Sequence, residues 1–60
     1  MKDDIVKHRT FGIGKVLEII TSDKIEVYFI DVDKKILNIN YAKLTLLEGD
    51  EANHPQLDNL

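Results

Sequence analysis

Apolar residues alternate with other residues through the run Ile25-Glu26-Val27-Tyr28-Phe29-Ile30. A period of two is the spacing of side chains along one face of a β-strand, so Ile25, Val27 and Phe29 are predicted to face a core. Polar turns separate this run from four other short segments of strand-like composition, at residues 4–8, 15–20, 35–39 and 44–47. No window carries an apolar stripe at helical spacing. The sequence therefore predicts an all-β fold of five short strands.

A flat sheet of this size would leave one apolar face in water, so we expect closure into a small five-stranded barrel. Residues 40–43 are predicted to form one helical turn before the last strand. The segments at 15–20, 24–30 and 35–39 are expected to form two successive hairpins. The predicted core consists of Ile5, Val6, Phe11, Val16, Ile19, Ile25, Val27, Phe29, Leu37, Ile39 and Leu44.

Charge divides the 60-residue chain into two parts. Residues 1–47 carry eight basic and seven acidic side chains, whereas residues 48–60 carry four acidic ones and no basic one. We assign the first part to the barrel and expect the second to be a loose acidic tail, or the stub of a longer chain. The sequence has no cysteine, no apolar run of membrane-spanning length and no signal-peptide pattern at its start. We expect a cytoplasmic protein.

The segment Phe11-Gly12-Ile13-Gly14 contains closely spaced glycines but lacks the third glycine and the following helix of a phosphate-binding loop. We therefore interpret it as a turn in which Gly12 takes a positive φ and Gly14 gives Phe11 room against the sheet. His8 is expected to lie half-buried at a strand end, hydrogen-bonded to the turn that follows. The motif residues predicted to be structural are His8, Phe11, Gly12, Gly14 and Val16.

No catalytic constellation is visible. The acidic pairs Asp3/Asp4 and Asp31/Asp33 fall at a terminus and in a predicted turn, outside any cleft that would perturb their chemistry. Two histidines without cysteine do not supply a convergent metal-ligand set. A domain this small buries only about 60% of its unfolded surface, which leaves little room for a substrate cavity. We expect no enzymatic activity, no metal and no cofactor.

Two surfaces could bind a partner. If Val27 and Phe29 face inward, an apolar patch with one acid is expected on the outer face, made of Glu26, Tyr28, Ile30 and Ile36. The alternative is that the tail or a register shift covers this patch. Basic residues could instead contact nucleic acid, together with Tyr28 and Tyr41 as stacking platforms. The basic candidates are Lys7, Arg9, Lys15, Lys34 and Lys35, although such charges also keep strand edges from pairing.

The string Asp4-x-Val6-x-His8-x-x-Phe11-Gly12-x-Gly14-x-Val16 resembles the opening of the small Tudor-like domain at the C-terminus of UvrD/PcrA-type helicases. It also resembles a family of small bacterial domains of unknown function. Later elements agree, and the resemblance covers roughly residues 4 to 47. These elements are Val27-x-Phe29, Lys35-x-Leu37 and Tyr41-Ala42-x-Leu44.

The resemblance implies a Tudor-like, SH3-like barrel that acts as a docking module for RNA polymerase. A more distant similarity is to the polymerase-interacting domains of CarD and of the transcription-repair coupling factor. Two departures matter: the chain carries no helicase, and Asp31-Val32-Asp33 stands where family members often have a turn glycine. The sequence therefore favours a non-catalytic protein-interaction module in transcription or DNA repair. The alternatives are a nucleic-acid-binding barrel and an accessory domain cut from a larger enzyme.

Overall fold

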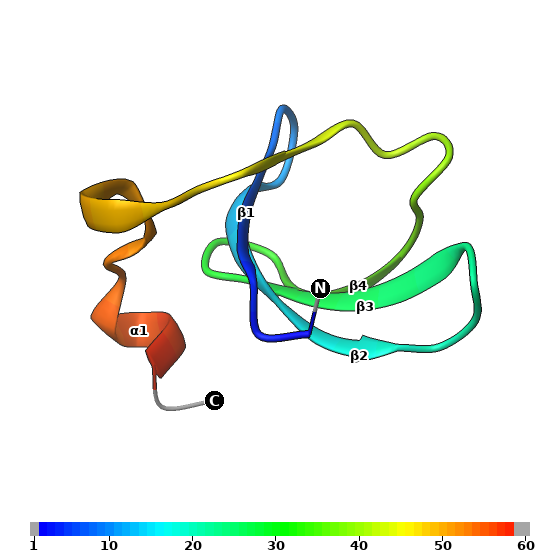
Figure 1. Ribbon diagram of the computed structural model, residues 1–60, viewed down its shortest axis with the longest axis horizontal. Coiled ribbons are helices and arrows are strands. Elements are labelled where there is room, and N and C mark those ends of the chain that lie inside the picture. Colours follow the sequence, from blue (N-terminus) through cyan, green and yellow to red (C-terminus); the bar gives the residue numbers. More distant parts are fainter. Residues whose placement is uncertain (1, 59–60) are drawn as a thin grey trace.

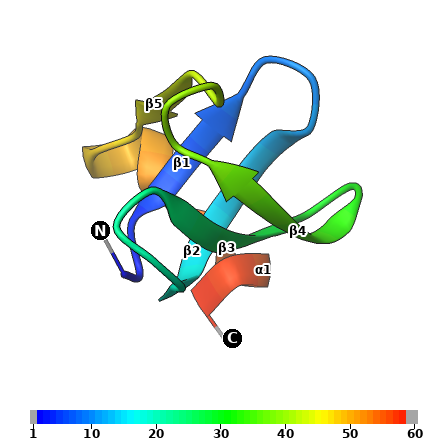
Figure 2. The same ribbon diagram turned by 90° about the vertical axis from the view of Figure 1, so that its right-hand side faces the viewer.

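A computed structural model describes residues 2–58 and contains one five-stranded antiparallel sheet in the order β4-β3-β2-β1-β5 (Figures 1 and 2). Its strands are β1 (Ile5–His8), β2 (Gly12–Ile19), β3 (Lys24–Phe29), β4 (Asp33–Asn38) and β5 (Leu44–Leu46). A 3-10 helix, η1 (Gly49–Ala52), and one short helix, α1 (Pro55–Asp58), follow. Within residues 2–58, no helix has the length and apolar character needed to cross a membrane.

The sheet curls around its inner face but does not close, so the predicted barrel is not confirmed (Figure 2). Strands β4 and β5 are its two edges. The two predicted hairpins are present as the pairs β2–β3 and β3–β4. Before β5, the amides of Tyr41 and Ala42 both donate to the carbonyl of Asn38, at 3.0 and 2.8 Å, which makes a single hydrogen-bonded turn near the predicted place.

The core lies on the inner face of the curled sheet. Its buried cluster consists of Val6, Val16, Ile25, Val27 and Phe29, with the predicted Phe11, Leu37, Ile39 and Leu44 packed partly buried against it. The prediction for Ile5 was wrong: it is half-buried and points away from the core, because the neighbouring Val6 points inward and side chains alternate along β1.

The prediction for Ile19 was wrong, because its side chain is 46% exposed. A register irregularity between Val16 and Glu18 places Ile19 across from Ile25. Opposite residues share a face, so Ile19 points to the core side of the sheet. It lies at the end of β2, however, and Ile20 next to it is also exposed. Alternation predicts the face of a residue but not where the covering layer ends.

The two motif glycines have different roles. Gly12 takes a φ of 86°, as predicted for a residue in the turn region. Gly14 is buried in β2, where an added Cβ would lie 2.7 Å from Cδ1 of Phe29 and 2.8 Å from Cγ1 of Val27. The atoms nearest to that position belong to β3, so Gly14 makes room for Phe29 and Val27, and Phe11 packs against Phe29 in turn.

His8 closes the turn between β1 and β2, as predicted. Its Nδ1 accepts hydrogen bonds from the amides of Thr10 at 3.0 Å and Phe11 at 3.1 Å. The imidazole stacks on the Phe11 ring with centroids 4.5 Å apart, and both rings contact Phe29. These contacts join the motif to the core and give His8 a structural role.

The turn between β3 and β4 contains no glycine and places Asp33 at its left-handed position. Asp33 takes a φ of 68°, in the left-handed region that aspartate tolerates better than most residues. Its Oδ1 accepts the amide of Lys34 at 2.8 Å. The β3–β4 hairpin therefore forms without a glycine in its turn.

The segment after Leu47 packs against the sheet instead of extending as a loose tail. Leu57 in α1 has 0% exposure, and its carbonyl accepts a hydrogen bond from Lys15 Nζ at 3.3 Å. Figure 1 shows α1 on the outer side of the sheet, beyond β1 and β2. The predicted boundary after residue 47 coincides with the end of the strands, but residues 55–58 are part of the packed structure.

Candidate protein-docking surface

Strand β4 presents unpaired backbone groups along one edge of the sheet. The amide of Ile39 donates to the carbonyl of Asp23 at 2.8 Å, so these two residues form a hydrogen-bonded pair. Leu37 and Lys35, two and four residues earlier, therefore also direct their amides and carbonyls toward β3. Because hydrogen-bonded and non-hydrogen-bonded pairs alternate in an antiparallel ladder, Lys34, Ile36 and Asn38 direct their amides and carbonyls away from β3.

Some of these outward groups already have partners. The amide of Lys34 donates to Asp33 Oδ1, and the carbonyl of Asn38 accepts from Tyr41 and Ala42. In the described part of the chain, no hydrogen bond engages the amide or the carbonyl of Ile36. The free edge is therefore short and centred on Ile36.

Three of the four predicted docking residues share the outer face of the sheet. Glu26 lies directly across from Ile36, and Tyr28 lies across from Lys34. The Ile36 side chain is 62% exposed, whereas Glu26 and Tyr28 are half-buried. Ile30 lies past the end of β3, half-buried, with its amide donating to the carbonyl of Ile13. Ile36 is thus the most accessible apolar side chain of the predicted patch.

The predicted basic residues do not form one surface. Lys34 shares the outer face with Tyr28, whereas Lys35 pairs with Val27 and places Nζ 5.6 Å from the centroid of the Phe11 ring. The Lys15 side chain is 13% exposed, and its Nζ lies 3.9 Å from Asp3 Oδ1 in addition to its bond with Leu57. Lys15 is therefore engaged within the chain and is poorly placed to contact a phosphate.

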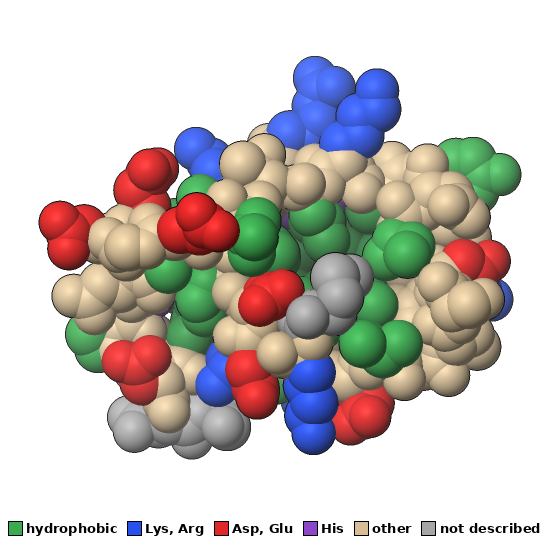
Figure 3. All heavy atoms as spheres, viewed as in Figure 1, with side chains coloured by type: hydrophobic (Ala, Val, Ile, Leu, Met, Phe, Trp, Pro, Cys, Tyr) green, Lys and Arg blue, Asp and Glu red, His purple; other side chains and the backbone are tan. Residues whose placement is uncertain are grey.

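Lys7 and Arg9 are exposed, at β1 and in the turn after it. In Figure 3 basic side chains gather at the top of the view, over the β1–β2 turn, and acidic side chains gather on the side of η1. Tyr41 is 82% exposed on the connection before β5, whereas Tyr28 is half-buried on the outer face of β3.

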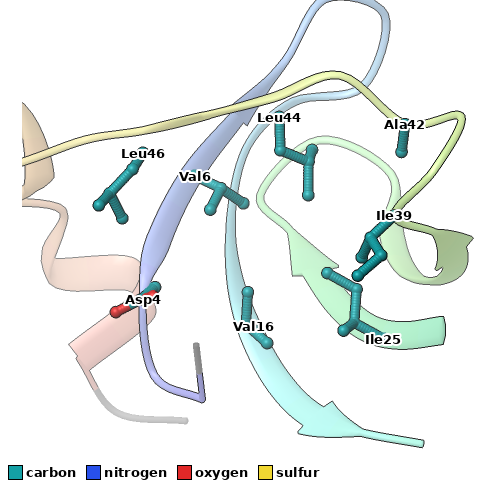
Figure 4. Close-up of a pocket in the computed structure, with 8 residues that line it drawn as sticks. All are labelled: Asp4, Val6, Val16, Ile25, Ile39, Ala42, Leu44 and Leu46. Carbon is teal, nitrogen blue, oxygen red and sulfur yellow. The ribbon is translucent and has the colours of Figure 1, made fainter. Parts of the chain in front are cut away.

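A cavity of about 240 Å³ opens on the inner face, between the connection that follows β4 and strands β1, β2 and β3. Figure 4 shows the side chains of Val6, Val16, Ile25, Ile39 and Leu44 around it. Its remaining lining residues are Asp4, Ala42 and Leu46. Its volume falls below the range of roughly 300 Å³ and more that is typical of small-molecule sites. It marks the opening where the sheet fails to close.

Sequence reasoning missed two apolar features of the surface. Leu46 of β5 is exposed at the other edge of the sheet, and Leu57 is buried although its segment looked too short and polar to pack. Alternation with Leu44 places Leu46 on the core side of β5 but does not indicate that it stays exposed there, and no alternation applies to Leu57. The signal for a helix at this place is Pro55, because proline suits the first turn of a helix. Nothing in the sequence indicates that Leu57, two residues later, is buried.

The described residues hold no group of three or more metal-ligating side chains. Comparison with protein-family models, with curated proteins and with solved structures finds no match to the chain. The functional argument therefore depends on the geometry of the surface and on the motif residues.

Proposed function

We propose that the chain is a non-catalytic protein-interaction module that receives a strand of its partner along β4. The observation that carries the proposal is Ile36, whose exposed side chain stands beside its own unpaired amide and carbonyl. An exposed apolar edge strand supports β-augmentation, in which main-chain hydrogen bonds give affinity and neighbouring side chains give specificity. Tyr28 and Glu26 on the same face would supply that specificity.

We further propose RNA polymerase, or a transcription or repair complex that contains it, as the partner. The support is the His8-to-Val16 motif, which resembles the polymerase-interacting Tudor-like domain of UvrD/PcrA-type helicases. On this proposal the curled sheet is an open form of a Tudor-like, SH3-like barrel. Positive φ at Gly12 and Asp33 is consistent with the turns that such a barrel requires.

The test uses two substitutions at one position. Ile36→Pro removes an amide that points away from β3, so it removes no hydrogen bond between β3 and β4. Proline is tolerated in an edge strand where the amide faces solvent. Ile36→Thr keeps the amide and the β-branched shape and removes most of the apolar surface. Each full chain is immobilised, and the retention of purified RNA polymerase is measured by surface plasmon resonance.

If β4 receives a partner strand, Ile36→Pro lowers the affinity about tenfold or more, since it deletes a hydrogen bond and places a ring in its path. Ile36→Thr is expected to weaken binding less. Thermal unfolding of both variants checks that each keeps the fold. Equal affinity of the Ile36→Pro variant and the wild-type chain would overturn the docking mode, and absence of polymerase binding by the wild-type chain would overturn the partner.

Nucleic-acid binding is a second candidate, favoured by the exposed Lys7 and Arg9 around the β1–β2 turn. It predicts binding to DNA or RNA that falls steeply with salt and that is lost in a Lys7→Ser, Arg9→Ser double variant. Ile36→Pro would leave that binding unchanged, so the same protein samples separate the two functions.

A further inference from the structure

Leu57 is buried in a place separate from the core. Its side chain has 0% exposure, yet it does not belong to the inner-face cluster built on Val16, Val27 and Phe29. Lys15, which bonds to the Leu57 carbonyl, alternates with the inward-facing Gly14 and Val16 and therefore points outward. Leu57 thus enters a slot on the outer face of the sheet, consistent with the position of α1 in Figure 1.

Lys15, the residue that bonds to α1, belongs to one cross-strand row on this face. Ile5 of β1 and Tyr28 of β3 both lie directly across from Lys15 of β2. All three residues are half-buried, although their side chains face away from the core. The row offers aliphatic and aromatic surface for a leucine side chain, and the Lys15 ammonium provides a hydrogen-bond donor for a main-chain carbonyl.

The connection that carries Leu57 to this slot has little hold on the sheet. From Glu48 to Gln56 no side chain is buried, and η1 has no buried residue. A helix as short as α1 is not stable in water without tertiary contacts. The contacts that hold α1 on the sheet include the buried Leu57 side chain and the hydrogen bond from Lys15, while Ala52 and His54 before it are only half-buried.

We propose that this slot is a binding site for a short acidic segment of a partner protein that bears a leucine, and that residues 55–58 are its internal ligand. The internal ligand defines the chemistry: a leucine side chain, a carbonyl for Lys15 and flanking acids such as Asp58. The inference rests on the proposed docking function and deepens it. A partner segment enters when α1 leaves, so the tethered leucine regulates access to Tyr28.

The test supplies the internal ligand in trans. The full chain with Leu57→Ser is labelled with nitrogen-15, and a synthetic peptide with the sequence of residues 49–60 is titrated into it. We expect amide shifts at Ile5, Lys15 and Tyr28. The wild-type chain should show shifts about tenfold smaller at the same peptide concentration, because its tethered segment competes at a high effective concentration.

Two controls match this experiment. The same peptide with serine in place of Leu57 should give no shifts. A Lys15→Met, Leu57→Ser chain should bind the unmodified peptide more weakly. Collapse of the Leu57→Ser spectrum would show that Leu57 is a structural core residue, and intact spectra without peptide shifts would show that the slot binds nothing in trans. Either result overturns the inference. Neither involves Ile36 or polymerase, so failure here is distinguishable from failure of the proposed function.

Discussion

Gly14 of β2 lies directly across from Phe29 of β3, and a Cβ at Gly14 would stand 2.7 Å from Cδ1 of the Phe29 ring. The same Cβ would be 2.7 Å from the carbonyl oxygen of Tyr28, which belongs to the backbone and cannot rotate away. The glycine therefore permits β2 and β3 to pair over the buried aromatic ring. The absence of a side chain at Gly14 therefore determines how closely β2 and β3 approach each other.

Gly14→Ala is accordingly expected to destabilise the domain by about 1–3 kcal/mol or more, since overpacking in a core forces backbone shifts. Urea unfolding followed by circular dichroism measures the change. Gly49→Ala separates backbone strain from crowding, because no atom lies within 4 Å of a Cβ there and its cost of about 1–2 kcal/mol comes from its φ of 62° alone. A Gly14→Ala chain as stable as the wild-type chain would show that β3 shifts readily to accept the methyl group.

Ile25 and Ile19 form a second matched pair, since they lie across from each other in β3 and β2 but differ in burial. Ile25→Ala should cost about 2–5 kcal/mol of unfolding free energy, the range for truncating a buried aliphatic side chain. Ile19→Ala should cost within about 1 kcal/mol, which is the scale of β-propensity alone. Similar losses in thermal unfolding at both positions would mean that the core extends to the end of β2.

The His8 turn gives a third prediction. His8→Phe keeps an aromatic ring beside Phe11 but removes the acceptor for the amides of Thr10 and Phe11. The Phe11 amide is partly buried, so we expect a loss of about 1–2 kcal/mol in urea unfolding. Faster hydrogen exchange at the Phe11 amide should accompany the loss. Unchanged exchange at that amide would assign the role of His8 to ring stacking alone.

Local patterns account for much of the fold. The alternation at Ile25, Val27 and Phe29 predicted three of the buried core residues, and the turn residues placed both hairpins. Gly12 and His8 were predictable because their roles depend on a positive φ and on hydrogen bonds within three residues. Such features arise from residues that are neighbours in the sequence.

The candidate surface was predictable only in part. Alternation placed Glu26, Tyr28 and Ile36 on one face, and the structure adds that Ile36 lies on an edge strand. Which strand is an edge depends on the order of all five, which no local pattern encodes. The basic pair Lys34 and Lys35 looked like one cluster, yet adjacent strand residues point to opposite faces.

The sequence by itself determined the five short strands, the face of most of their residues and the Gly12 turn, because these follow from side-chain alternation and local backbone preference. Tertiary structure decided that the sheet stays open, that Ile19 lies beyond its cover and that Gly14 makes room for Phe29. It also decided the burial of Leu57, whose main-chain carbonyl accepts a hydrogen bond from Lys15, 42 residues away in the sequence. Burial at that distance depends on where the chain folds back, and a leucine in a polar segment carries no mark of its destination.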